Sequence, residues 1–265
     1  MKKARFLIFM LLLILLAFGC LGETESFESD HEAVEHMESI DIVPPSETLF
    51  TVTELQLFPP EQVFDADFEA FYKEFVAAVH NRDIQFIDSI LDEMVHSSFG
   101  GEPGKAFFHE FWEAQSNYFE RDLWTVLEEI IALGGVFYQE NELFSGHGKR
   151  FVAPYTFALF DLSDLQEKNG MDAFNSFVVI DRHVNVYREK SIESEVIDVL
   201  NYNILEFHNN MEFWSKGSDD FVGVMALSGE VGYIQVKHIR SPVDYRFAIE
   251  WKDDGWKLIF LTAGD

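Results

Sequence analysis

Residues 245–262 read YRFAIEWKDDGWKLIFLT and carry the clearest structural signal in the chain. Every second position in the first half is a large apolar residue, namely Tyr245, Phe247, Ile249 and Trp251. This is the period of a β-strand. Asp254-Gly255 supplies a tight turn, and residues 256–262 return as a second strand. The segment predicts a C-terminal β-hairpin, which we expect to complete a sheet formed earlier in the chain.

The preceding part of the chain, from residue 61 to residue 175, is mainly helical in its pattern. Phe68, Phe71, Tyr72, Phe75, Val76 and Val79 recur at helical spacing, with Asp65 or Asp67 as the N-cap. Three further helices are expected over residues 84–95, 107–112 and 123–131, followed by strands at 136–138 and 151–157. Pro154 would make the second of these strands an edge. We therefore expect an α+β module at 61–175.

Residues 176–241 change to short strands separated by turns. The expected strands are 177–180, 184–187, 196–200, 204–207, 221–225 and 232–236. This density of strands predicts a small β-barrel. The hairpin at 242–265 then follows it, so the barrel is either inserted into the helical module or precedes that module's last strands.

Three sequence blocks in the β-rich segment resemble a known family. These blocks are Val184-Asn185-Val186-Tyr187-Arg188, Ser194-Glu195-Val196-Ile197-Asp198-Val199-Leu200 and Gly232-Tyr233-Ile234-Gln235-Val236-Lys237-His238-Ile239-Arg240. In this order they resemble the bacterial SH3-like (SH3b) domain. That resemblance implies an SH3-like barrel that binds a cell-wall peptide or an envelope protein. The candidate ligand-binding residues are aromatic: Tyr187, Tyr202, Trp214 and Tyr233.

The helical module has a weaker resemblance of its own. Two early helices joined at Asn81-Arg82-Asp83 and followed by strands resemble the start of the NTF2-like α+β fold. Members of that family often contain a pocket, and some are enzymes. Tyr72 and Tyr155 are the aromatic hydroxyls that could serve as an acid or base, but core tyrosines with one hydrogen bond each are the favoured interpretation.

The N-terminus carries a targeting signal. Residues 1–5 include three basic side chains, and residues 6–18 are an unbroken apolar run of 13 residues, too short to cross a bilayer. Ala17-Phe18-Gly19-Cys20 resembles the lipobox of bacterial lipoproteins. This resemblance implies cleavage after Gly19 and lipidation, including a palmitate-type acyl chain, at Cys20. Residues 20–60 are then expected to be a lipidated acidic tether.

Charge excludes one class of partner. Without the three basic residues of the signal, the chain has 16 basic and 47 acidic residues, a net charge of −31. Such a surface repels phosphate backbones, so we expect no nucleic-acid partner. The single cysteine excludes an internal disulfide.

No catalytic spacing is present in the sequence. The histidines of the segment His31–His36 are five positions apart, whereas the helical zinc-protease motif requires four. Gly100–Lys105 lacks the spacing of a phosphate loop. We therefore expect no catalytic residue, no metal site and no cofactor.

The expected protein is a non-catalytic binding or scaffold lipoprotein of the cell envelope, in the outer membrane if the cell is Gram-negative. Its partners would be the membrane, through the lipid, and a cell-wall peptide or envelope protein. Two alternatives stay open. One is an NTF2-like pocket enzyme, either a hydrolase or an isomerase. The other is an inhibitor or immunity-like lipoprotein.

The lipid anchor gives a direct test. A Cys20→Ser chain should incorporate no labelled fatty acid and should accumulate as uncleaved precursor, because only the thiol of Cys20 can accept the lipid. Metabolic labelling and membrane fractionation measure both effects. Unchanged processing and membrane partitioning would contradict the anchor.

Overall fold

The structure is a computed structural model that describes residues 49–98, 101–118, 121–138, 149–163, 165–207, 217–252 and 255–264. The signal segment, Cys20 and Trp214 lie outside these residues. Residues 46–265 form one compact unit. The expected α+β fold is confirmed, with one sheet of five strands and one of eight.

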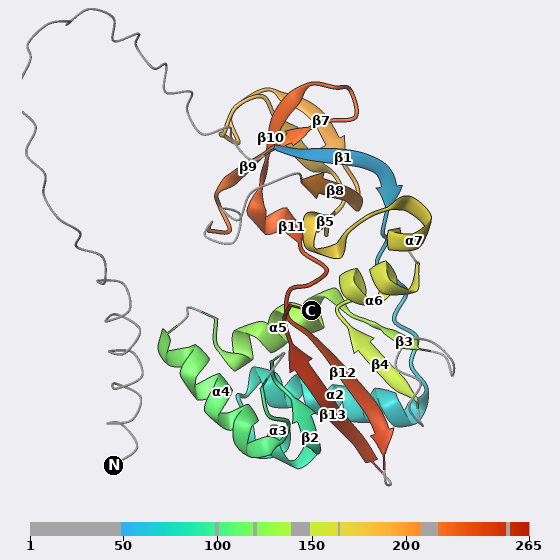
Figure 1. Cartoon of the computed structure of the whole chain (residues 1–265), viewed down its shortest axis with the longest axis vertical. Coiled ribbons are helices and arrows are strands. Elements are labelled where there is room, and N and C mark those ends of the chain that lie inside the picture. Colours follow the sequence, from blue (N-terminus) through green and yellow to red (C-terminus); the bar gives the residue numbers. More distant parts are fainter. Residues whose placement is uncertain are drawn as a thin grey trace, which may run out of the picture. The chain divides into compact units, whose positions relative to one another are not determined.

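The C-terminal hairpin lies within the five-stranded sheet, whose order is β2-β13-β12-β4-β3 (Figure 1). The strands are β2 (Leu91–His96), β3 (Val136–Tyr138), β4 (Arg150–Ala153), β12 (Arg246–Lys252) and β13 (Gly255–Thr262). β12 pairs antiparallel with both β13 and β4. The hairpin therefore completes a sheet that residues of the helical module begin, as expected.

Four helices pack against one face of this sheet. They are α2 (Ala66–His80), α3 (Ile84–Ile90), α4 (Lys105–Tyr118) and α5 (Leu123–Leu133). Each of three acidic side chains caps a helix by accepting a backbone N–H: Asp65 from Phe68, Asp83 from Gln85 and Phe86, and Asp122 from Thr125. The helices share a core with the sheet. Alternate side chains of β12, namely Phe247 and Ile249, point into this core.

Aromatic rings fill the space between the helices and the sheet. The ring of Phe68 lies 4.7 Å from those of Phe137 and Trp256 and 4.9 Å from that of Phe151, measured between centroids. All four belong to or pack against one core cluster. Packed aromatic side chains therefore fill the space between these helices and this part of the sheet.

Two expected elements of the helical module are wrong. The helix expected over 84–95 ends at Ile90, and β2 follows because Leu91 pairs with Leu258 of β13 in parallel register. The strand expected over 151–157 ends at Ala153. Pro154 has no N–H to donate to a neighbouring strand, so it cannot continue the sheet pairing. It occupies the N-cap position of α6 (Tyr155–Leu162) instead. β4 is also not an edge, since it lies between β12 and β3.

The opposite face of the five-stranded sheet carries α6. Ala158 of this helix packs with Tyr138, Val152 and Ala248, which lie on β3, β4 and β12. Ala248 stands between Phe247 and Ile249, so the alternation of β12 serves both faces.

The eight-stranded sheet has the order β11-β5-β8-β1-β9-β10-β6-β7. Its strands are β1 (Leu49–Gln56), β5 (Ser176–Val179), β6 (Val184–Tyr187), β7 (Val196–Leu200), β8 (Asn203–Phe207), β9 (Phe221–Met225), β10 (Val231–Gln235) and β11 (Ile239–Arg240). The short helix α7 (Leu165–Asn169) follows α6 in the chain and precedes β5. No sheet is closed in the part of the chain that the structure describes, so the SH3-like barrel is not confirmed.

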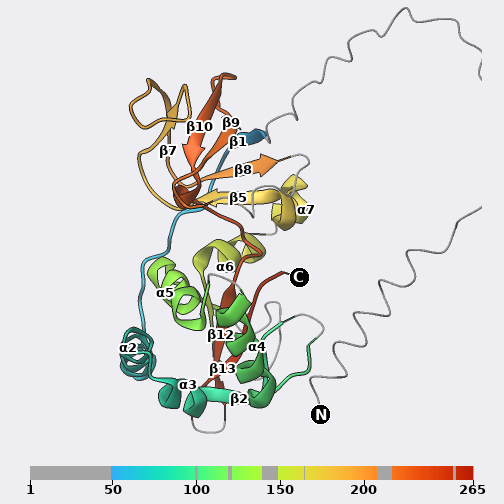
Figure 2. The same ribbon diagram turned by 90° about the vertical axis from the view of Figure 1, so that its left-hand side faces the viewer.

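The tether expected over residues 20–60 is too long. β1 lies in the interior of the eight-stranded sheet, antiparallel to β8 and parallel to β9 (Figure 2). The physical reason is an alternation within the acidic region: Phe50 and Val52 are buried among the residues of the sheet's core, whereas Thr51 is exposed. The folded part thus begins before Pro59-Pro60.

Truncation tests the role of the hairpin. A chain of residues 46–240 loses β12 and β13, and with them Phe247 and Trp256 from the core. Each lost core aromatic costs about 3–5 kcal/mol, comparable with the stability of many domains. The fragment should aggregate, as measured by sedimentation and thermal unfolding. Trp251, which is 43% exposed, contributes less to this loss.

The matched control is a chain of residues 46–265, which keeps the whole compact unit and should unfold cooperatively. A soluble 46–240 fragment with cooperative unfolding would contradict the requirement for the hairpin.

Candidate functional site

Tyr187 and Tyr233 lie directly opposite each other in the eight-stranded sheet. They are Cα partners in the antiparallel pairing of β6 and β10. Their neighbours Val186 and Ile234 are buried in the core of this sheet. Because successive side chains of a strand point to opposite faces, both tyrosines lie on the face away from that core. Both remain partly accessible to solvent.

Two further apolar side chains extend this pair. The ring of Phe221 on β9 meets that of Tyr187 edge-on, with centroids 6.1 Å apart. Val196 on β7 is the Cα partner of Tyr187, and 42% of its surface is exposed. We call Tyr187, Val196, Phe221 and Tyr233 the aromatic face. It draws on four strands, β6, β7, β9 and β10.

Polar groups border the aromatic face. Asn185 donates from Nδ2 to the hydroxyl of Tyr187 over 3.4 Å, and Nζ of Lys190 lies 5.3 Å from the centroid of the Tyr233 ring. A ring with a cation over its face is held in place by the ring quadrupole. The arrangement combines flat apolar surface with hydroxyl and amide groups that can donate or accept hydrogen bonds.

The other two predicted ligand-binding residues are not on this face. Tyr202 is only 9% exposed, its ring lies 5.4 Å from that of Phe58, and its carbonyl accepts the N–H of Leu57 over 2.8 Å. These contacts hold β1 against the turn between β7 and β8. Trp214 lies outside the described residues.

Sequence reasoning missed Phe221 and Val196 as site residues. The signal that could have identified Phe221 is the alternation of β9, in which Val222 and Val224 enter the core and Phe221 must therefore face outward.

Of the acid or base candidates of the enzyme alternative, Tyr155 is a buried core residue and Tyr72 is partly buried against the core. The ring of Tyr72 packs 5.1 Å from that of Phe64 and 5.5 Å from that of Phe68, and burial raises the pKa of Tyr72 to about 12. Burial also raises the pKa of Tyr155, whose hydroxyl has no hydrogen-bond partner among the described residues. Neither side chain is prepared to lose a proton near neutral pH.

A pocket of about 330 Å³ lies between α4 and the start of α5. Its titratable groups include Arg82, His109 and Glu113. They are partly or fully exposed, so no buried acid or base converges there. Among the described residues no three His, Cys, Asp or Glu side chains are grouped so as to hold a metal ion.

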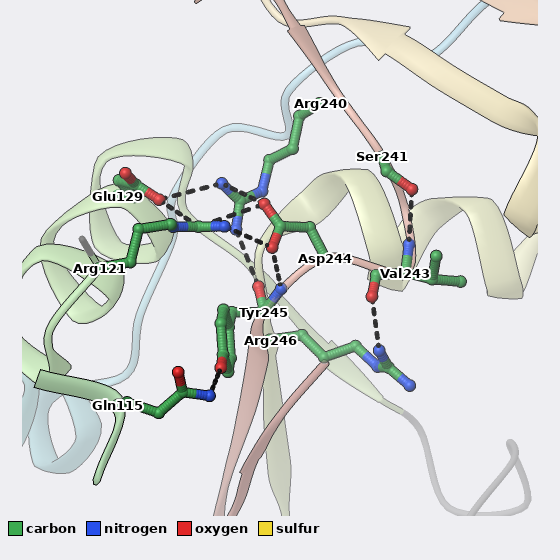
Figure 3. Close-up of polar contacts among 9 residues, drawn as sticks. All are labelled: Gln115, Arg121, Glu129, Arg240, Ser241, Val243, Asp244, Tyr245 and Arg246. Atoms are coloured by element: carbon green, nitrogen blue, oxygen red, sulfur yellow. Dashed lines mark hydrogen bonds and ion pairs between the residues drawn. The ribbon is translucent and has the colours of Figure 1, made fainter. Parts of the chain in front are cut away.

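A partly buried polar cluster joins β11, the β11–β12 connection, α5 and the residue Arg121 just before α5 (Figure 3). Arg121 donates to both carboxylate oxygens of Asp244, over 2.9 and 3.2 Å, and to Glu129. Arg240 lies 3.4 Å from Asp244 and 3.6 Å from Glu129, and it donates to the carbonyl of Tyr245 over 2.9 Å. Two arginines thus share two carboxylates.

This cluster is structural. Its charges cancel, and each charged group already has opposite partners within it, so no charge is left for a ligand. Burial alone would raise the pKa of Asp244, but Arg240 and Arg121 outweigh it and hold that pKa below its ordinary value of 3.8. The cluster fixes Tyr245, whose hydroxyl accepts from Gln115 over 2.8 Å, at the start of the hairpin.

Comparison with known proteins adds no relationship. No family model, curated protein or solved structure matches this chain. None of the helices in the described residues has both the length and the apolar character needed to cross a bilayer.

The charge cluster predicts a specific pH dependence. Since the pKa of Asp244 is lower in the folded than in the unfolded chain, its ion pairs stabilise the fold above pH 3.8, and this contribution is lost as the pH falls through the folded-state value. Asp244→Asn should cost about 2–3 kcal/mol at pH 7, because it leaves the buried Arg240 and the partly exposed Arg121 with one carboxylate, that of Glu129. Urea unfolding between pH 2 and 7 measures both quantities.

The free energy of unfolding of Asp244→Asn should also change less between pH 2 and 7 than that of the wild type. Asp219→Asn is the control: its side chain is 86% exposed, and its pairing with Lys237 spans 3.5 Å. That change should alter stability by less than about 0.5 kcal/mol. Equal effects of the two substitutions would show that the cluster contributes nothing particular.

Proposed function

We propose that this protein is a non-catalytic binding lipoprotein of the bacterial cell envelope, and that it binds its partner through the aromatic face. The observation that carries the proposal is the direct cross-strand pairing of Tyr187 with Tyr233, extended by Phe221. Two residues named from the SH3-like resemblance therefore lie together, on the side of the sheet away from its core.

The chemistry of the aromatic face suits recognition. Tyrosine supplies a large rigid apolar surface at little cost in side-chain entropy, together with one hydroxyl. Binding hot spots are enriched in such residues and are surrounded by side chains that exclude water. Val196 and Phe221 provide such neighbours. Neither side chain belongs to the core of the eight-stranded sheet, so core packing does not explain why they are apolar.

The partner class follows from charge. With the signal removed, the chain carries a net charge of −31, which disfavours polyanions and favours neutral or basic surfaces. A neutral or basic cell-wall peptide, or a neutral or basic surface of an envelope protein, meets this condition. Attachment at Cys20, inferred from the N-terminal sequence, would hold the aromatic face within the envelope.

The aromatic core supports a binding role over the enzyme alternative. Tyr72 packs against the rings of Phe64 and Phe68, and its pKa is raised rather than tuned toward neutrality.

Substitution of both tyrosines tests the proposal. Full-length Tyr187→Ala/Tyr233→Ala protein should co-sediment with protein-free peptidoglycan sacculi at least about tenfold less tightly than wild type, because each hot-spot truncation commonly costs about 2 kcal/mol. Photo-crosslinking in intact cells from position 196, which also lies on the aromatic face and is not substituted in the double variant, is the parallel assay for a protein partner.

Phe174→Ala is the matched control, since Phe174 is also an exposed aromatic (44%) but lies outside the aromatic face. It should keep wild-type binding. Thermal unfolding of each variant separates loss of contact from loss of structure. Full binding by the double variant, in both assays, would refute the aromatic face as the binding surface.

A further inference from the structure

Three large aromatic side chains are among the residues that line the pocket between α4 and α5. Phe108 and Trp112 come from α4, and Trp124 comes from the first turn of α5. Its volume, about 330 Å³, is at the small end of the range for ligand pockets. The pocket belongs to the helical module, so it is separate from the aromatic face.

The charged groups of the pocket are not equivalent. Arg82 lies 3.5 Å from Asp122, and His109 lies 2.9 Å from Asp88, so both already have acidic partners. Glu113 also lines the pocket, and its carboxylate has no ion-pair partner among the described residues. The charge available to a ligand is therefore the negative charge of Glu113.

We propose that this pocket binds a small organic ammonium ion with an apolar body. The carboxylate of Glu113 would pair with the ammonium group, and the rings of Trp112, Trp124 and Phe108 would contact the apolar body. Aromatic faces attract cations through their quadrupole, and tryptophan does so most strongly. An aromatic wall beside an unpaired carboxylate is thus complementary to an aryl- or alkylammonium ion.

An anionic ligand fits this site less well. Arg82, Glu113 and the partners Asp88 and Asp122 together carry one positive and three negative charges, a net charge of −2, and a positive charge on His109 would still leave a net charge of −1. The surrounding chain is also strongly acidic. Both local and overall fields therefore raise the concentration of cations near the pocket and lower that of anions.

Isothermal titration calorimetry of the full chain with phenethylammonium tests the proposal, with phenylacetate and 2-phenylethanol as probes of the same ring but different charge. Wild-type protein should bind one equivalent of phenethylammonium, and it should bind the alcohol and the anion more weakly. Glu113→Gln, which keeps the size of the side chain, should weaken phenethylammonium binding about three- to fivefold, the range for a partly solvated ion pair.

Glu110→Gln is the matched control, since Glu110 lies on the same helix, is exposed and does not line the pocket. It removes the same charge and should leave the affinity unchanged. Three results would overturn the proposal: no saturable 1:1 binding of phenethylammonium, equal weakening by the two substitutions, or tighter binding of phenylacetate.

Discussion

The position of β12 in the interior of the five-stranded sheet is the constraint on which the rest of the helical module depends. β12 bonds to β13 on one side and β4 on the other. Its alternate side chains supply Phe247 and Ile249 to the aromatic core and Ala248 to the layer under α6. The charge cluster at Arg121, Arg240 and Asp244 fixes where this strand begins. Without β12, neither face of the sheet could pack.

Local patterns predicted those elements that have a single dominant period. The hairpin at 245–262 is predictable because apolar residues recur at every second position of its first strand. The helix α2 is predictable because its apolar residues recur every three to four positions. β2 was misread because its buried residues, Leu91 and Val95, are four positions apart, which fits a helix equally well. Its partner, Leu258, lies far away in the sequence, and only that pairing decides the matter. β1 was missed because acidic composition masked a short alternation.

The candidate sites show the same limit. Tyr187 and Tyr233 were identified from motif blocks, and the register of β6 and β10 places them together. Tyr202 belongs to the same resemblance but is buried under Phe58, a contact that depends on the unforeseen strand β1. The pocket of Glu113 could not be foreseen either. It forms where α4 packs beside the start of α5, and the spacing along a single helix does not encode that crossing.

The pairing of β1 with β8 has a consequence for how the chain reaches its native state. Phe50 pairs with Phe207, and β2 pairs with β13 near the C-terminus, so both sheets join segments that are far apart in sequence. Loop-closure entropy must be overcome before such pairings contribute any stability, which makes folding slow compared with that of a helical bundle. During synthesis the interior strand β1 stays without its neighbours until most of the chain has been made. Folding of the whole unit must therefore wait until β8, β9 and β13 have been synthesised.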